Sequence, residues 1–352
     1  MITVLIVEDS SVVRDFLRHI LSADPEIQVI GTASDGAAAL DVVQHQKPDV
    51  ITMDIYMPRM NGLEATRKIM ETHPTPIVIV SSSVVADEVA TTFRAIEAGA
   101  LAAVPRPQGL GHSEHEATAQ ELVQTVKLMS EVKVVRRWPR PRSGSRVPAA
   151  QRADMPRAST AIQVVAIGAS TGGPLVLQTL LSGLPKDFPV PVLIVQHMAA
   201  GFIPGFAEWL AQSTGFPVHV AAVDDYLLPG HAYVAPDGAH MRVGMGRRIV
   251  LSQDAPKNGV RPSVSYLFQS VAHVFGCYAA GLLLTGMGKD GAEELKLLRD
   301  KGAVTMVQDR DSAVVYGMPG EAIKLDAATY VLSPERMVAG LVRLADKKGT
   351  TL

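Results

Sequence analysis

The pattern that most constrains the fold is an alternation of short apolar runs with longer amphipathic stretches. Apolar runs rich in β-branched residues predict strands, and apolar residues at every third or fourth position predict helices. In the first part of the chain the predicted strands are Ile2–Val7, Val29–Ala33, Val50–Met53, Pro76–Val80 and Ala100–Val104. The predicted helices are Ser11–Leu21, Ala37–His45, Gly62–Thr72, Asp87–Ala98 and Glu114–Glu131. This order indicates a doubly wound parallel sheet with its ligand site at the carboxyl ends of the strands.

The same alternation resumes near residue 162. Predicted strands are Val164–Gly168, Val190–Gln196, Val218–Ala222, Ala232–Ala235, Met241–Val243, Ile249–Ser252, Gly281–Thr285 and Ala303–Val307. Predicted helices are Pro174–Gly183, Ile203–Thr214, Ser263–Phe275, Ala292–Lys301 and Gly320–Leu325. We therefore expect a second, mostly parallel α/β domain. The segment Met241–Ser252, which turns at Gly244, Gly246 and Arg247, predicts a β-hairpin appended to its sheet.

Residues 131–160 interrupt the alternation. They are rich in Arg, Pro, Ser and Ala and nearly free of acids, so they cannot bury much apolar surface and predict a linker. We thus expect one domain at residues 1–130, the linker at 131–160 and a second domain at 161–350. With 352 residues, 47% of them hydrophobic, each domain has enough apolar side chains for a core of its own.

Composition narrows the location and the partners. The formal net charge of -2 provides no overall basic field to attract nucleic acid. The single cysteine, Cys277, cannot form an internal disulfide, which fits a reducing compartment, and the apolar run Phe275–Leu284 around it predicts burial. The N-terminus shows no basic leader, and no apolar run reaches the length of a membrane span. We expect a soluble, cytoplasmic protein without direct membrane insertion.

Acidic residues follow two of the predicted strands in the first domain. Glu8 and Asp9 come after the first strand and Asp54 after the third, so all three should meet at one edge of the sheet. Mg²⁺ between them would relieve their repulsion and leave open positions for phosphate oxygens, and one carboxylate could then accept a phosphoryl group. Ser81 and Arg106, near the ends of the fourth and fifth strands, supply a hydroxyl and a cation for that phosphate. The alternative is that the acids are solvated strand ends.

Four strings resemble the receiver domains of response regulators, which have a flavodoxin-like fold: VEDSS at 7–11, DIYMPRMNG at 54–62, IVIVSSS at 77–83 and EAGALAAVPRP at 97–107. The resemblance implies that Asp54 is the phosphoacceptor. It also implies that Glu8, Asp9 and Asp54 bind Mg²⁺ together with the backbone carbonyl of Tyr56.

The same resemblance implies that Ser81 and Arg106 form the switch that senses the phosphoryl group, and that a cis peptide precedes Pro107. Two positions depart from the pattern of the family. Arg106 stands where lysine is usual, which keeps the charge but replaces a compact ammonium by a planar guanidinium. Ala103 stands where an aromatic switch residue is frequent.

A glycine-flanked serine marks the second domain. Ser170 lies in VVAIGASTGGP, where a strand runs into a helix whose unpaired N–H groups could stabilise an oxyanion. His197 ends the next apolar strand, and Asp290 follows a later one in GLLLTGMGKDG. Because each residue sits just past a strand, we expect the three to meet at one edge of the sheet as nucleophile, base and orienting acid.

Each of these residues also has a simpler interpretation. Ser170 is a candidate helix N-cap, His197 a core histidine and Asp290 a cap of the helix that follows it. The string around Ser170 fits G-x-S-x-G, but the order Ser–His–Asp differs from the Ser–Asp–His of the α/β-hydrolase fold. The joint placement favours catalysis. Four further histidines have no metal-ligand spacing and are predicted to be structural: His219, His231, His240 and His273.

Six strings of the second domain resemble the chemotaxis protein-glutamate methylesterases, the CheB family: GASTGGP at 168–174, QHM at 196–198, YVAPDGAHM at 233–241, RPSVSYLFQSVA at 261–272, LLTGMGKDGA at 283–292 and YGMPGEAI at 316–323. The resemblance implies hydrolysis of glutamate methyl esters on methyl-accepting chemoreceptors, with release of methanol, and deamidation of receptor glutamines. It gives Ser170, His197 and Asp290 the roles above, places Thr171 and the backbone around Met287 near the oxyanion, and requires no cofactor for the esterase.

Joined in one chain, the two domains suggest an enzyme controlled by phosphorylation. A histidine kinase of the chemotaxis type is the expected phosphodonor for Asp54, and a receiver that covered the esterase cleft would block a protein substrate. The alternative is a response regulator whose C-terminal domain is a nucleotide- or DNA-binding output module. Against this alternative, the sequence has no helix-turn-helix pattern and no G-x-x-x-x-G-K-[ST] motif.

Overall fold

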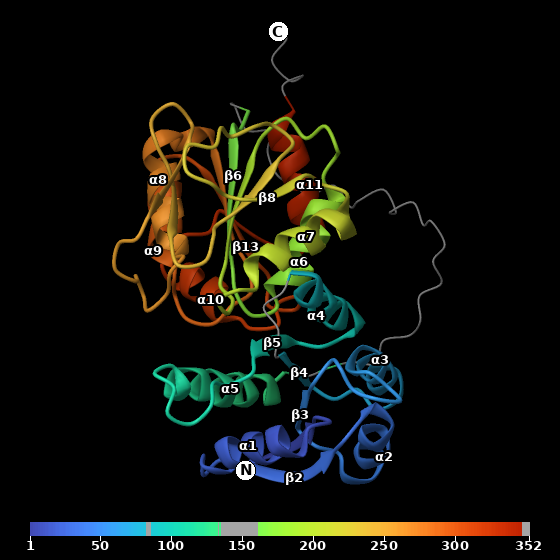
Figure 1. The fold of residues 1–352 in the computed structure, drawn as a ribbon. Coiled ribbons are helices and arrows are strands. Elements are labelled where there is room, and N and C mark those ends of the chain that lie inside the picture. The colour runs from blue at the N-terminus through green and yellow to red at the C-terminus, as the bar shows by residue number, and fades with distance from the viewer. Residues whose placement is uncertain (82–85, 133, 135–160, 347–352) are drawn as a thin grey trace. The chain divides into compact units, whose positions relative to one another are not determined.

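The computed structural model describes residues 1–81, 86–132, 134 and 161–346. They form two compact units, which lie within Met1–Ser143 and Gly144–Leu352 (Figure 1). Apart from its first residues, the predicted linker falls outside the described residues. The domain limits at residues 130 and 161 therefore stay predictions.

The first unit is a five-stranded parallel sheet with the strand order β2-β1-β3-β4-β5. Its strands are β1 (Ile2–Val7), β2 (Ile27–Ala33), β3 (Val50–Met53), β4 (Ile77–Ser81) and β5 (Ala102–Pro105). Its helices are α1 (Ser11–Ser22), α2 (Gly36–Gln46), α3 (Gly62–Thr72), α4 (Ala86–Ala98) and α5 (His115–Ser130). The predicted doubly wound α/β fold is confirmed, and β3 and α3 occupy the predicted residues.

Two layers of helices cover this sheet. Helices α1 and α5 contact each other, while α2, α3 and α4 form a second row (Figure 1). Because both faces are covered, β3 and β4 are buried along their whole length. The side chains of Ser10 and Asn61 cap α1 and α3 by accepting from the backbone N–H groups of Val13 and Glu64. These caps fix where the chain leaves β1 and β3, which is where the acidic residues lie.

The second unit is a seven-stranded parallel sheet with the order β14-β13-β12-β6-β7-β9-β8. Its strands are β6 (Val164–Ala169), β7 (Val192–Gln196), β8 (Val218–Val220), β9 (Ala232–Val234), β12 (Ala279–Leu283), β13 (Val304–Gln308) and β14 (Tyr330–Leu332). Its helices are α6 (Gly173–Gly183), α7 (Ile203–Thr214), α8 (Val264–Val274), α9 (Ala292–Asp300), α10 (Gly317–Lys324) and α11 (Pro334–Ala345). Strand β6 is the central strand, and it is buried throughout.

Here too, helices cover both faces of the sheet. Helix α9 contacts α8 and α10 on one face, and α6 contacts α7 and α11 on the other (Figure 1). At the end of β6, Gly172 has φ +79° and precedes α6, a conformation that suits glycine. This turn lets the chain reverse from strand to helix directly after Ser170.

The predicted hairpin is present but forms a sheet of its own. Strands β10 (His240–Val243) and β11 (Ile249–Ser252) pair antiparallel and do not hydrogen-bond to the seven-stranded sheet. The apolar side chains of Met241, Val243 and Ile249 join the core that includes Phe268 of α8. The hairpin therefore covers α8 rather than extending the main sheet.

The predicted burial of Cys277 is wrong. Cys277 is exposed in the single-turn 3-10 helix η1 (Gly276–Tyr278), which connects α8 to β12. The apolar run around Cys277 does not form one continuous buried segment, because the chain enters the sheet only at Ala279.

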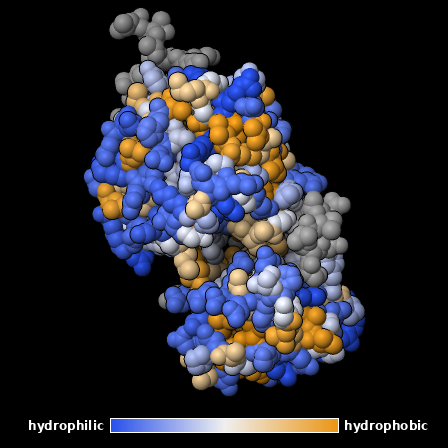
Figure 2. Space-filling model, turned by 60° about the vertical axis from the view of Figure 1, so that its left-hand side comes forward, coloured by the Kyte–Doolittle hydropathy of each residue, from blue (hydrophilic) through white to orange (hydrophobic). Residues whose placement is uncertain are grey.

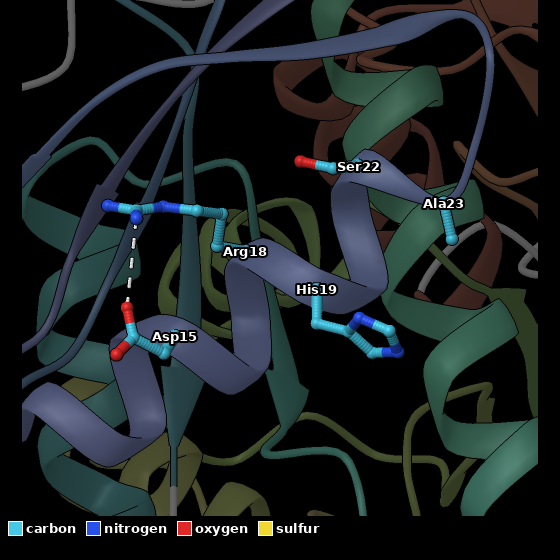
Figure 3. Close-up of a pocket in the computed structure, with 5 residues that line it drawn as sticks. All are labelled: Asp15, Arg18, His19, Ser22 and Ala23. Carbon is cyan, nitrogen blue, oxygen red and sulfur yellow. Dashed lines mark ion pairs between the residues drawn. The ribbon is translucent and has the colours of Figure 1, made fainter.

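The surface of each unit has its own hollows and apolar side chains. A hollow of about 500 Å³ lies along α1, and Figure 3 shows the residues that line it: Asp15, Arg18, His19, Ser22 and Ala23. In the second unit, exposed apolar side chains lie on β8, on β11 and between β8 and β9: Val220, Val223, Tyr226, Leu228 and Val250. Figure 2 shows hydrophobic residues gathered in patches among hydrophilic ones. Among the helices that the structure describes, none combines the length and apolar character needed to cross a membrane.

Candidate active site

Three neighbouring strands of the second unit carry the predicted catalytic residues. Ser170 directly follows β6 and His197 directly follows β7, where Ala169 is paired with Gln196. The backbone N–H of His197 donates to the carbonyl of Ala169 at 2.9 Å, so the pairing continues to the end of both strands. Asp290 lies in the loop between β12 and α9. Since β12, β6 and β7 are adjacent and parallel, their carboxyl ends bring these residues to one crevice.

His197 and Asp290 are directly paired. The imidazole Nε2 lies 3.0 Å from Oδ2 of Asp290, and the two side chains are 13% and 5% exposed. This bond leaves Nδ1 as the ring nitrogen that can accept a proton. Among the described residues no hydrogen bond joins the Ser170 hydroxyl to this ring. Adjacent strands lie about 4.8 Å apart, so the serine and the histidine start from neighbouring backbone positions. The catalytic roles stay predictions.

Asp290 is held by several donors besides His197. Its carboxylate accepts from the hydroxyls of Ser263 and Ser265 at 2.7 and 2.9 Å, from the amide of Asn258 at 3.1 Å and from the backbone N–H of Val264 at 2.7 Å. Burial alone would raise the pKa of Asp290, but hydrogen bonds from His197, Ser263 and Asn258 hold it well below the ordinary value. Asp290 is therefore ionised and fixed in orientation, as an orienting acid must be.

Sequence reasoning did not single out these donors. Ser263 and Ser265 flank the start of α8, and Ser263 also caps the helix by accepting from the N–H of Ser265. A serine just before an apolar helix, such as Ser263 before α8, is a capping signal, but the strand-end rule does not connect either serine with Asp290. His240 contacts Ser263: it is fully buried, and its Nδ1 accepts from the N–H of Ser263 at 3.1 Å. A structural role for His240 agrees with the prediction.

Two backbone N–H groups are candidate donors to an oxyanion. Among the described residues, neither Thr171 N–H nor Met287 N–H donates to a protein acceptor. The carbonyl of Gly286 accepts from the N–H groups of Gly317 and Met318 at 3.1 and 2.9 Å. Because a trans peptide is planar, this anchor also fixes the direction of the Met287 N–H. Both groups are thus available as donors to a developing negative charge, although their role stays a prediction.

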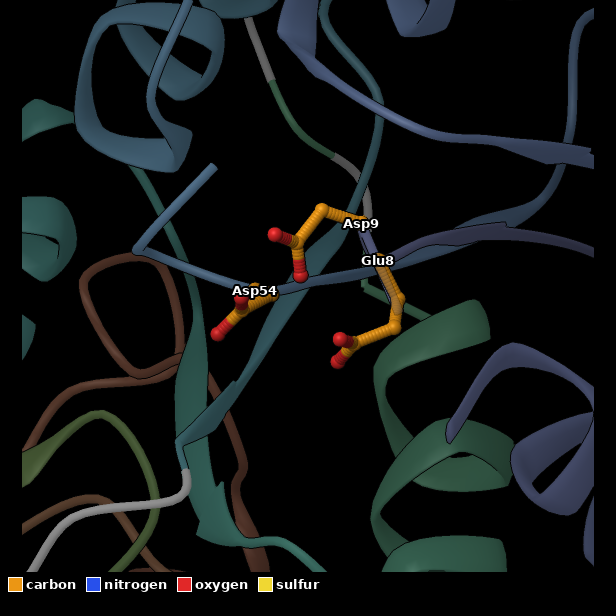
Figure 4. A group of neighbouring side chains, drawn as sticks. All are labelled: Glu8, Asp9 and Asp54. Atoms are coloured by element: carbon orange, nitrogen blue, oxygen red, sulfur yellow. The ribbon is translucent and has the colours of Figure 1, made fainter. Parts of the chain in front are cut away.

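The acidic residues of the first unit come together as the sequence predicts. Glu8 and Asp9 follow β1 and Asp54 follows β3, and one carboxylate oxygen of each lies within 4.8 Å of the others (Figure 4). Among the described residues this is the one group of three or more acids, histidines or cysteines with the spacing of a metal site. The 2.8 Å contact between His219 and His231 joins only two rings.

The electrostatics of this acidic cluster fit a cation. Burial and the nearby charge of Asp54 raise the pKa of Glu8 to about 7, although Arg106 opposes the shift. Burial also raises the pKa of Asp54. Burial is the main cause of both shifts, and Arg106 compensates the negative charge of the cluster only in part. A hard divalent ion such as Mg²⁺, which prefers oxygen ligands, would supply the missing charge.

The predicted switch residues lie beside this cluster. Arg106 follows β5, and its Nη2 lies 3.0 Å from Oε2 of Glu8. Its backbone N–H donates to the carbonyl of Ser81, the last residue of β4, at 2.7 Å. The cis peptide expected before Pro107 is wrong, because the one cis peptide among the described residues precedes Pro262. Tyr56 is half-exposed in the loop after Asp54.

The two units together define a class of protein: a response regulator with an α/β output domain that carries a serine, a histidine and an aspartate at its central strands. Residues 4–114 match the response regulator receiver domain family, and residues 165–341 match the family described as CheB methylesterase. The chain belongs to the CheB methylesterase family.

Relatives are similar over the whole chain. A protein-glutamate methylesterase/protein-glutamine glutaminase of Geobacter metallireducens is 60% identical over 349 residues, covering 99% of this chain and 100% of the relative. One from Nitrosospira multiformis is 56% identical, covering 100% and 99%. The crystal structure of the CheB methylesterase catalytic domain of Thermotoga maritima is 32% identical, with a TM-score of 0.51, covering 53% of this chain and 100% of that domain. The nucleotide- or DNA-binding alternative finds no support.

Proposed function

We propose that this chain is a protein-glutamate methylesterase that acts on methyl-accepting chemoreceptors and is controlled by phosphorylation of its receiver domain. The observation that carries the proposal is the buried His197–Asp290 pair, with its 3.0 Å contact, beside the strand end that bears Ser170. The full-length similarity to proteins named as methylesterases and glutaminases supports the substrate class.

In the first half of the reaction, the Ser170 hydroxyl attacks the carbonyl carbon of a glutamate methyl ester. His197 accepts the hydroxyl proton, and Asp290 stabilises the imidazolium that forms. The carbonyl oxygen becomes an oxyanion, which the N–H groups of Thr171 and Met287 can bind. Collapse of this intermediate breaks the bond to the methoxy group, which leaves as methanol with the proton from His197.

In the second half, water attacks the acyl-enzyme. His197 takes a proton from the water, a second tetrahedral intermediate forms, and its collapse frees Ser170 and a glutamate carboxylate. A receptor glutamine would follow the same route, with ammonia as the leaving group in place of methanol. The fixed position of Asp290 serves both reactions, because each step needs the same imidazole orientation.

The receiver domain supplies control. Asp54 is the proposed phosphoacceptor, with a histidine kinase of the chemotaxis type as donor. Glu8, Asp9, Asp54 and the carbonyl of Tyr56 would hold Mg²⁺, which neutralises carboxylate and phosphate oxygens when bound. Ser81 and Arg106 would contact the new phosphoryl group. A coupling free energy of about 1–3 kcal/mol would change esterase activity about 5- to 150-fold.

The cytoplasmic location stays a prediction, which cell fractionation would check.

The test is methanol release from methylated receptor. Ser170→Ala should lower the rate roughly 10³-fold or more, as expected for loss of a nucleophile. Ser182→Ala, which changes an exposed serine of α6, is the matched control and should keep wild-type activity. Equal rates for Ser170→Ala and the control would contradict the proposed mechanism.

A further inference from the structure

The last residue of β7 is a buried glutamine in an otherwise apolar strand. Gln196 is 2% exposed, and its Nε2 donates to two backbone carbonyls, those of Ser170 and His197, at 2.8 Å each. We infer that Gln196 is a positioning residue for the hydrolysis proposed above: it sets the direction of the Thr171 N–H and locks the strand ends that bear the nucleophile and the base. The inference rests on the proposed function of this site.

The first step of the argument is the planarity of the peptide bond. The carbonyl of Ser170 and the N–H of Thr171 belong to one trans peptide, so they lie in one plane and point in opposite directions. The carbonyl is held by Gln196 and by the N–H of Gly173, also at 2.8 Å. Fixing that carbonyl therefore fixes the Thr171 N–H, which has no acceptor among the described residues.

The two candidate oxyanion donors differ in how they are anchored. Backbone N–H groups hold the peptide that carries the Met287 N–H, through the carbonyl of Gly286. For the Thr171 N–H, a side chain supplies one of the two anchors. A substitution at Gln196 can therefore misalign one donor and leave the other in place.

The second step concerns the base. The same Nε2 that holds the Ser170 carbonyl also holds the carbonyl of His197. It thus crosslinks the two strand ends just beyond the last paired residues, Ala169 and Gln196. A shift of one strand end against the other would change the distance between the serine hydroxyl and the imidazole, on which proton transfer depends.

The third step concerns the fit of the amide. Both partners of Nε2 are carbonyl oxygens, so only the nitrogen of the amide can face them. Among the residues that the structure describes, its buried Oε1 has no hydrogen-bond partner, an arrangement that costs free energy and is uncommon in native structures. Gly173 makes room for this oxygen, because a Cβ there would lie 2.1 Å from Oε1. The protein thus keeps a partly unsatisfied amide where an apolar side chain would fill the space.

The experiment compares Gln196→Met, which keeps the length of the side chain without a donor, with wild type in the full chain. We expect kcat for methanol release to fall about 10- to 100-fold, as for a misplaced donor, with KM nearly unchanged. The pH at which activity falls on the acid side should not move, because Gln196 donates to backbone carbonyls and to neither side chain of the His197–Asp290 pair. The shorter side chain of Gln196→Asn can reach only one carbonyl, so its kcat should lie between those of Gln196→Met and wild type.

Thr305→Val is the matched control. Thr305 of β13 is fully buried. Its hydroxyl donates to the carbonyl of Ala327 at 2.6 Å and accepts from the N–H of Thr329 at 2.9 Å, so the substitution also removes buried hydrogen bonds. It should lower the melting temperature and leave kcat unchanged. If Gln196→Met and Gln196→Asn retain as much kcat as this control, or raise KM alone, the inference is overturned.

A second readout separates this inference from the proposed substrate. A fluorophosphonate forms a bond between phosphorus and the serine oxygen and releases fluoride, so its rate measures the reactivity of Ser170 without a receptor. Gln196→Met should slow this reaction in parallel with kcat. A wild-type chain that reacts with the phosphonate but releases no methanol would refute the proposed substrate, while the phosphonate rates would still decide the role of Gln196.

Discussion

Replacing Ser263 by alanine tests how the protein holds its proposed catalytic acid. Ser263 is fully buried, and its hydroxyl donates to Oδ1 of Asp290 at 2.7 Å. The hydroxyl oxygen of Ser263 also accepts from the N–H of Ser265 at 3.2 Å and so caps α8. Alanine removes both interactions at once and leaves no polar atom in their place.

The size of the effect follows from these two contacts. A hydrogen bond to a charged group is worth about 1.5–3 kcal/mol. Loss of a helix N-cap costs about 0.5–2 kcal/mol. Because Asn258, Ser265 and the N–H of Val264 still donate to Asp290, we expect a loss of about 2–3 kcal/mol in the free energy of unfolding at neutral pH.

The pH dependence has a definite sign. Burial opposes ionisation of Asp290, but its donors hold the folded-state pKa below the ordinary value of 3.8. A carboxyl with a lowered pKa adds stability above its unfolded pKa, and that stability is lost as the pH falls through the folded pKa. Ser263→Ala raises the folded pKa. The difference between wild type and variant should therefore be constant near neutral pH and shrink only as the pH falls through the folded pKa of the variant.

Urea unfolding between pH 3 and pH 8 measures this difference, with the fluorescence of Trp209, buried in α7, as the signal. Thr305→Val is the control, because all the hydrogen bonds that it removes have neutral partners and their cost should not vary with pH. The series extends to the lowest pH at which both proteins still fold, and a cost for Ser263→Ala that is the same there as at pH 7 would refute the reasoning that Ser263 stabilises an ionised carboxylate.

Three further predictions concern the receiver domain. Asp54→Asn should abolish incorporation of phosphate from an acyl phosphate, measured by mass spectrometry, and should leave basal esterase activity within about two-fold of wild type, since Asp54 lies outside the esterase unit. Removing Mg²⁺ with EDTA should stop phosphorylation of the wild-type chain without affecting methanol release; esterase activity that falls with EDTA would contradict the assignment of the metal to the receiver. Arg106→Lys should keep the phosphorylation rate within a few-fold, whereas Arg106→Ala should lower it about 10-fold or more, because only alanine removes the cation beside Glu8; equal rates would exclude an electrostatic role.

Much of the fold follows from local pattern. The apolar runs that become β3 and β11 and the amphipathic stretches that become α3 and α7 have the predicted limits, because each ends at a polar or glycine-rich turn. No predicted strand or helix covers β14 and α11. Strand β14 has only three residues, and one of them, Val331, is half-exposed on the edge of the sheet. Such a short strand carries little periodicity of its own.

Local pattern likewise predicts some residues of the candidate site and not others. The sequence predicts Ser170, His197 and Asp290 as site residues because each lies just past an apolar strand. Gln196, Ser263 and Ser265 were not, because their role depends on which strands become neighbours, and the order of β12, β6 and β7 is not written in any local pattern. The prediction that Cys277 is buried was wrong for a related reason, because an apolar run predicts burial only where the chain enters the sheet.

The position of β6 at the centre of seven strands affects how the enzyme loses activity. The short edge strands β8 and β14 can open locally while β12, β6 and β7 stay closed, so amide hydrogens of the three inner strands should exchange with solvent only through global opening of the domain. Local opening of β8 or β14 would then leave the esterase activity unchanged. Heat inactivation should accordingly coincide with cooperative melting of this domain rather than precede it.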